Sequence, residues 1–182
     1  MQRRLSLSRQ LSIERKPAIG RKTIGFINDG KIHAVLDTNV IIYALEALFK
    51  KSAASQTEKD SLEIVLLLEK RVLVIGLNSG LFEEYRKVAA RMLAEQRIAS
   101  HDLIYILNLV EQNSVGVRRF VDPQRVSPHK NDDVLFDGLA TTYLVSNNLN
   151  DVKPSKLYQP SSYHSTLSPY AFLNDLRNKK LI

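Results

Sequence analysis

The chain has 182 residues, 44% of them hydrophobic, which suits one domain with a sizeable core and a short extension. It contains no cysteine, which excludes disulfides and thiolate-bound zinc, and no apolar run of membrane-spanning length, so we expect a cytoplasmic protein with no membrane association. Residues 1–31 hold eight basic and two acidic side chains, a net charge of +6 out of the chain's +7.

A basic, Ser-rich segment opens the chain, and we expect residues 1–22 to form a flexible arm before a domain at 23–182. Such an arm buries no core, but it can neutralise phosphates and hold a nucleic acid near the domain. A solubilising tail or a cloning remnant explains the same composition equally well. The candidate nucleic-acid-binding residues are Arg3, Arg4, Arg9, Arg15, Lys16, Arg21 and Lys22.

Strand-like and helix-like patterns alternate along the domain, which predicts an α/β fold. Thr23–Ile27 and Ile32–Leu36 flank a turn signal and predict a hairpin that leads into the first core strand. The next expected elements are a helix over 60–70, a strand over 71–77, a helix over 80–96 capped by Ser79, a helix over 101–113 capped by Ser100, a strand over 115–120, a helix opened by Asp132, and a final helix over 170–176 capped by Ser168.

Two registers are open between residues 132 and 168. Either the helix opened by Asp132 ends near Ala140 and residues 143–146 form a strand, or the helix continues to Asn147 and the strand spans 156–159. Periodicity allows both arrangements.

Asp37 stands where the first core strand ends and an apolar helix begins. Residues 33–36 form a short, mostly apolar run, as in a strand covered on both faces, and an apolar helical pattern begins at Val40. In open α/β sheets, ligands bind in the crevice outside the carboxyl ends of the strands. A carboxylate at this junction is therefore well placed to hold a metal or a phosphate.

Two later acidic clusters supply further candidates. Glu84 lies at helical spacing beside Leu81 and Val88, on the edge of an apolar stripe, where a carboxylate is costly unless it is paired or bound to a cation. Helix capping explains Asp132 well, whereas Asp133 lies on one helix face with Asp137 and is the better ligand candidate. Asp37, Glu84 and Asp133 would offer a divalent cation hard oxygen ligands from three elements.

The segments VLDTNVIIYAL, LFEEYRKVAAR, NDDVLFDGLA and SPYAFLNDL resemble, in order and spacing, those of the PIN-domain nucleases over roughly residues 32–177. The resemblance implies a PIN-like three-layer α/β/α domain with a central, mainly parallel sheet, preceded by the basic N-terminal extension.

By this resemblance the chain would be a metal-dependent endoribonuclease that hydrolyses single-stranded RNA with a metal-activated water. Asp37, Glu84 and Asp133 would be the catalytic residues and would bind one or two Mg²⁺ or Mn²⁺ ions. The supporting residues would be Thr38, Asn39, Asp132, Asp137 and Asn148. The family also implies an antitoxin or an RNA-processing partner, and a homodimer.

The chain departs from the family at the fourth acidic position. Many members carry an Asp just after the next strand, whereas this sequence offers Asn148 and Asn150, or Ser161 and Ser162 in the other register. This departure keeps an alternative open, in which the chain is a catalytically weak or inactive PIN-like module that binds RNA or a partner. A haloacid-dehalogenase-type phosphatase is disfavoured, because it needs a second acid where Asn39 stands.

Overall fold

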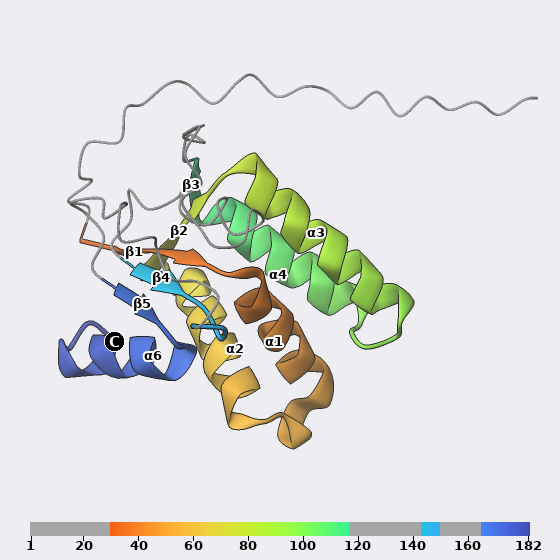
Figure 1. Cartoon of the computed structure of the whole chain (residues 1–182), viewed down its shortest axis with the longest axis horizontal. Coiled ribbons are helices and arrows are strands. Elements are labelled where there is room, and N and C mark those ends of the chain that lie inside the picture. Colours follow the sequence, from red (N-terminus) through yellow and green to blue (C-terminus); the bar gives the residue numbers. More distant parts are fainter. Residues whose placement is uncertain (1–29, 117–142, 150–164) are drawn as a thin grey trace, which may run out of the picture.

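The computed structural model describes residues 30–116, 143–149 and 165–182. Its strands form one all-parallel sheet in the order β3-β2-β1-β4-β5, flanked by helices (Figure 1). The strands are β1 (Ile32–Leu36), β2 (Leu73–Leu77), β3 (Ser114–Gly116), β4 (Tyr143–Val145) and β5 (Ser165–Leu167). The helices are α1 (Thr38–Lys50), the short 3-10 helix η1 (Lys51–Ala53), α2 (Gln56–Glu69), α3 (Ser79–Ala94), α4 (Ser100–Gln112) and α6 (Pro169–Asn178). The expected α/β class and parallel sheet are confirmed.

Strand β1 lies between β2 and β4, and its sequence explains that central place. Ala34, Val35 and Leu36 have no exposed surface, as expected for a strand covered on both faces. Ala34 is in register with Ile75 on one side and with Tyr143 on the other. Residues 23–27, the expected hairpin partner of β1, lie outside the described residues.

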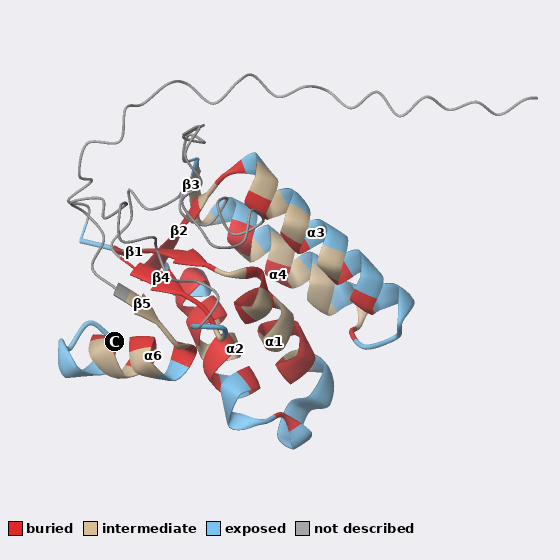
Figure 2. Ribbon diagram, viewed as in Figure 1, coloured by how far each residue is buried: buried red, intermediate tan, exposed pale blue. Residues whose placement is uncertain are grey.

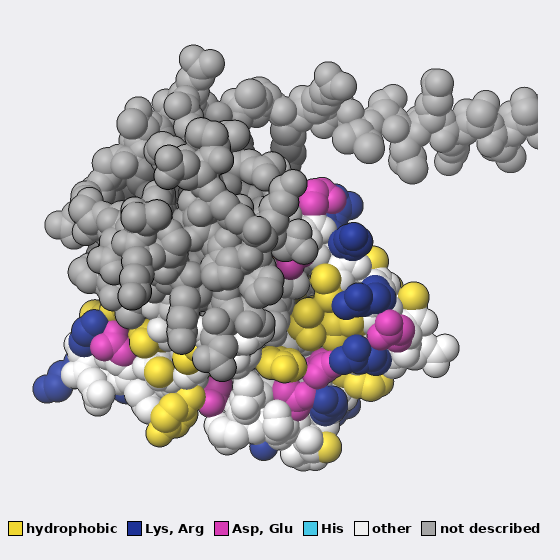
Figure 3. Space-filling view, in the orientation of Figure 1, with side chains coloured by type: hydrophobic (Ala, Val, Ile, Leu, Met, Phe, Trp, Pro, Cys, Tyr) yellow, Lys and Arg dark blue, Asp and Glu magenta, His cyan; other side chains and the backbone are white. Residues whose placement is uncertain are grey.

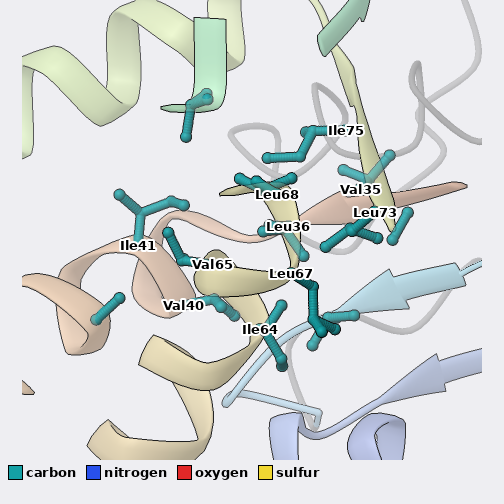
Figure 4. Close-up of a cluster of buried hydrophobic side chains, with 14 of the residues drawn as sticks. Val35, Leu36, Val40, Ile41, Ile64, Val65, Leu67, Leu68, Leu73 and Ile75 are labelled. Atoms are coloured by element: carbon teal, nitrogen blue, oxygen red, sulfur yellow. The ribbon is translucent and has the colours of Figure 1, made fainter. Parts of the chain in front are cut away.

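The core forms where α1 and α2 pack on each other and on the sheet. Figure 4 shows side chains from β1, β2, α1 and α2 meeting there, among them Leu36, Ile41, Ile64 and Leu73, all at most 1% exposed. In Figure 2 the buried residues follow the sheet and the helix faces turned toward it, while the outer helix faces are exposed. Because the apolar side chains at the end of β1 and at the start of α1 are buried in this core, the strand–helix junction at Asp37 is held in place.

Helix α2 begins four residues earlier than the apolar pattern predicts. Ser55 and Glu58 form a capping box: the Glu58 amide donates to Ser55 Oγ (3.3 Å) and the Ser55 amide donates to Glu58 Oε2 (2.7 Å). The predicted start at Asp60 is therefore wrong, because the reciprocal cap extends the helix back to Gln56.

The predicted caps of α3 and α4 are also wrong, whereas that of α6 is confirmed. Asn78, and not Ser79, caps α3, because its side chain accepts from the Leu81 amide at 2.8 Å. Helix α4 begins at Ser100 itself, with Ala99 at the N-cap position. At α6, Ser168 Oγ accepts from the Ala171 amide at 3.2 Å, as predicted.

Strand β4 settles the strand position of the ambiguous segment. It spans Tyr143–Val145, which confirms the register with a strand at 143–146, one residue shorter than expected. The helix expected after Asp132 and the alternative strand at 156–159 lie outside the described residues, as do residues 117–120 of the strand expected over 115–120.

A lysine joins α1 to α2 away from the sheet. Lys50 Nζ lies 3.2 Å from Glu46 Oε2 and also contacts Glu58, and both carboxylates are almost fully buried. The hydrogen bond from Lys50 lowers the pKa of Glu58 to about 2. This ion pair therefore depends on pH in the acid range.

In the part of the chain that the structure describes, no helix has the length and apolarity needed to cross a membrane.

Candidate functional site

The strand order creates a switch point between β1 and β4. Strands β2 and β3 lie on one side of β1, and β4 and β5 lie on the other. Because all the strands are parallel, their carboxyl ends meet at one edge of the sheet (Figure 1). This is the position where open α/β sheets bind their ligands.

Asp37 and Ser146 are neighbours at this point, because each directly follows its strand in a matched register. Leu36 pairs with Val145, and the Asp37 amide continues the ladder by donating to the Val145 carbonyl at 2.9 Å. Ser146 is fully buried, and its hydroxyl donates to Asp37 Oδ2 at 2.5 Å. The pairing of β1 with β4 therefore places a hydroxyl donor against the Asp37 carboxylate.

Asn39, in the first turn of α1, braces the same carboxylate. Its amide nitrogen donates to Asp37 Oδ2 at 2.6 Å and to Ser146 Oγ at 3.3 Å. Its carbonyl oxygen accepts from the Asn147 backbone amide at 3.0 Å. One side chain thus connects the ends of β1 and β4.

Glu84 joins the site from α3. Thr38, only 5% exposed, donates from Oγ1 to Glu84 Oε1 at 2.8 Å. Glu84 is partly buried, whereas Glu83 is exposed and pairs with Arg86 at 3.0 Å. Glu84 therefore faces the domain, as its helical spacing beside Leu81 and Val88 predicts, whereas the neighbouring Glu83 faces solvent.

The solvent side of α3 carries charges of both signs. On the face shown in Figure 3, Lys and Arg side chains lie among Asp and Glu side chains near α3. The ion pairs on this helix include Arg86 with Glu83 and Arg91 with Glu95. Glu84 takes part in neither of these ion pairs, and its carboxylate instead contacts Thr38 on the inner side of α3.

Tyr85 ties α3 to the end of β1. The side chain is 1% exposed, and its hydroxyl donates to the Leu36 carbonyl, one residue before Asp37. Burial and the negative charges of Asp37 and Glu84 hold the pKa of the Tyr85 phenol well above its usual value. The phenol therefore remains protonated and keeps this bond across the ordinary pH range.

Asp37 lies in an environment that disfavours its charge. Burial raises the pKa of the Asp37 carboxyl, although hydrogen bonds from Ser146, from the backbone of Thr38 and Asn39 and from the Asn39 side chain oppose the rise. None of the ion pairs among the described residues involves Asp37 or Glu84. A cation at this point would offset the cost of the two carboxylates.

The structure brings four of the predicted site residues together: Asp37, Thr38, Asn39 and Glu84. Asn148 reaches the site through its backbone amide, which donates to Ser146 Oγ at 2.9 Å, while the residue itself is exposed. The remaining predicted residues lie outside the described ranges: Asp132, Asp133, Asp137, Arg3, Arg4, Arg9, Arg15, Lys16, Arg21 and Lys22.

Sequence reasoning missed Ser146. The apolar pattern includes this residue in the strand, so the candidates for the fourth position were Asn148 and Asn150, or Ser161 and Ser162 in the other register. The structure ends β4 at Val145 and places Ser146 beside Asp37. The available signal was that Ser146 is the first polar residue after the apolar run YLV.

The donor set of this site suits a hard divalent cation. It combines the Asp37 carboxylate at the end of β1, the Glu84 carboxylate of α3 that bonds to the adjacent Thr38, and hydroxyl and amide groups. Side-chain donors engage one oxygen of each carboxylate, Oδ2 of Asp37 and Oε1 of Glu84. Within residues 30–116, 143–149 and 165–182, no three His, Cys, Asp or Glu side chains gather into a metal-binding group. The expected third ligand, Asp133, lies outside those ranges.

No protein-family model matches the chain, and no curated protein resembles it significantly.

Proposed function

We propose that the chain is a metal-dependent endoribonuclease that hydrolyses single-stranded RNA. The observation that supports this most is the braced acidic pair, Asp37 and Glu84, at the switch point of a parallel sheet. Neither member of the acidic pair has a Lys, Arg or His partner among the described residues, and both are at least partly buried. This is an arrangement that a divalent cation would stabilise.

The fold proposed for this activity is the PIN-like three-layer α/β/α domain. Two features support it: the sheet order β3-β2-β1-β4-β5, and an acidic residue directly after the central strand with a second on the inner side of α3. Asp133 would complete the ligand set, as the sequence resemblance implies.

The chemistry follows from charge. Asp37 and Glu84 would hold Mg²⁺ or Mn²⁺, which when bound acidifies a water molecule and neutralises charge on a phosphate. Ser146 and Asn39 hold the Asp37 carboxylate, and Thr38 holds Glu84. Tyr85 keeps α3 against the end of β1, so the two carboxylates keep their spacing. The protein's own contribution is therefore a preorganised pair of anionic ligands.

RNA is the proposed substrate because of the charge of the chain. The net charge is +7, and the basic arm at 1–22 carries most of the excess. Such an arm would tether phosphates near the acidic site, and binding would then weaken steeply with salt. An antitoxin or RNA-processing partner and a homodimer belong to the same proposal.

Ser146 favours a second candidate function. It is the residue directly after β4, and the positions beyond it where the resemblance expects an acid hold Asn148 and Asn150. A protein that lacks this acid could keep the fold and bind RNA or a partner without cleaving it.

The test uses two adjacent glutamates of α3. Glu84→Gln and Glu83→Gln each remove one negative charge from the same helix, but only Glu84 contacts Thr38. Cleavage of labelled single-stranded RNA would be measured with Mn²⁺, with Mg²⁺ and with EDTA. We expect cleavage by the wild type and by Glu83→Gln, and a loss of cleavage in Glu84→Gln and in EDTA.

Two results would contradict this proposal. Equal cleavage by Glu84→Gln and Glu83→Gln would remove Glu84 from the site. RNA binding by the wild type that weakens with salt, without cleavage under any metal condition, would instead support the second candidate.

A further inference from the structure

The Ser146 hydroxyl uses its full hydrogen-bonding capacity. A serine hydroxyl has one proton to donate and two lone pairs that accept. Ser146 donates to Asp37 Oδ2 at 2.5 Å, and it accepts from the Asn148 amide at 2.9 Å and from Asn39 Nδ2 at 3.3 Å. Because these two nitrogens can only donate and a carboxylate accepts, the Ser146 proton points at Asp37.

This arrangement fixes how Asp37 is presented. The side chains of Ser146 and Asn39 both donate to Oδ2, and neither side chain donates to Oδ1. Two donors from different elements on one oxygen restrain the rotation of the carboxylate about its last bond. Oδ1 is therefore the oxygen that faces away from this pair of donors.

We propose that Ser146 is a positioning residue for the cation, and that it presents Asp37 Oδ1 by holding Oδ2. The inference rests on the proposed function, since it assigns a role to the same site. An acid at position 146 would accept hydrogen bonds only and would place a second negative charge against Asp37, where the structure has a donor.

The effect of Ser146 on metal binding can be separated from its effect on folding. Ser146→Ala removes the donor without adding volume, and Ser146→Thr keeps the hydroxyl. Ser168 is a matched control, because it also follows a strand at this edge of the sheet but caps α6 through the Ala171 amide. Ser168→Ala removes this cap, so it should lower the urea midpoint of unfolding and leave the acidic pair intact, and urea unfolding of each variant would verify the loss of stability.

The experiment measures the affinity of the full chain for Mn²⁺ alone, by electron paramagnetic resonance of free and bound Mn²⁺. We expect Ser146→Ala to bind Mn²⁺ about 10–100-fold more weakly, the cost seen when partners of metal ligands are removed. Ser146→Thr should restore most of the affinity, and Ser168→Ala should bind as the wild type does.

The outcomes distinguish the two proposals. If the wild type binds Mn²⁺ and Ser146→Ala binds it equally well, the positioning role is overturned and the proposed function stands. The same follows if Ser168→Ala weakens Mn²⁺ binding as much as Ser146→Ala does. If the wild type binds no Mn²⁺, both the positioning role and the metal-dependent function are overturned.

Discussion

Replacing Tyr85 by Phe tests whether one buried hydroxyl holds α3 to the end of β1. The side chain is 1% exposed, and its hydroxyl donates to the Leu36 carbonyl. Phe keeps the ring and its packing and removes only this bond. Because a buried carbonyl then loses a donor, we expect the free energy of unfolding to fall by about 1.5 kcal/mol. In a domain of this size such a loss lowers Tm by about 3–6 °C.

The assay is urea unfolding followed by circular dichroism, with a thermal scan as a second reading. Tyr170→Phe is the matched control, since Tyr170 is 62% exposed and should change stability by less than about 0.5 kcal/mol. The midpoint should fall in Tyr85→Phe while the slope of the transition stays constant. If both variants match the wild type, the bond between Tyr85 and Leu36 does not hold α3 in place.

Three further predictions concern stability. Gln96 follows α3 in the left-handed region, with a φ of 57°, and its backbone amide donates to the Leu93 carbonyl at 3.1 Å. Because glycine adopts this conformation without steric cost, Gln96→Gly should raise the free energy of unfolding by about 0.5–1 kcal/mol. A lower urea midpoint in Gln96→Gly than in the wild type would refute this. Glu58, whose pKa is lowered to about 2, stabilises the fold fully above about pH 5 and loses this effect as the pH falls toward 2. Glu58→Gln should therefore be less stable than the wild type at pH 7, with a gap that narrows at pH 3; a constant gap would contradict the ion pair with Lys50. Phe172 is fully buried, and its ring lies edge-on to that of Tyr143 with the ring centroids 5.2 Å apart. Phe172→Ala should therefore lower the free energy of unfolding by about 3–5 kcal/mol, as measured by urea unfolding. A decrease below about 1 kcal/mol would show that α6 does not pack as described.

The sequence predicts the parts of the site that local patterns determine. The apolar strand before Asp37 and the apolar helix after it place the carboxylate at a strand end, as the structure has it. Helical spacing alone separates the inward Glu84 from the outward Glu83. These features need no knowledge of distant contacts, because they depend on periods of two and 3.6 residues.

Features that depend on pairing between distant segments could not be predicted in this way. The strand order brings Ser146 beside Asp37, 109 positions apart in the chain, and only the register of β4 against β1 shows it. Asn78 and Ser79 are both good capping residues, so composition does not choose between them; the hydrogen bond to Leu81 does. The Ser-x-x-Glu spacing of the capping box at Ser55 and Glu58 is present in the sequence, but the apolar periodicity of α2 begins only near Asp60 and therefore predicts a later start of the helix.

In the proposed function, Asp37 holds the cation with which the chain cleaves RNA. The most direct measurement compares Asp37→Asn with the wild type in cleavage of labelled single-stranded RNA with Mn²⁺. Asn keeps the shape of the side chain but removes the charge that a cation needs. We expect cleavage by the wild type, and cleavage by Asp37→Asn that falls to the background seen in EDTA. Cleavage by Asp37→Asn at the wild-type rate would contradict the assignment of this site.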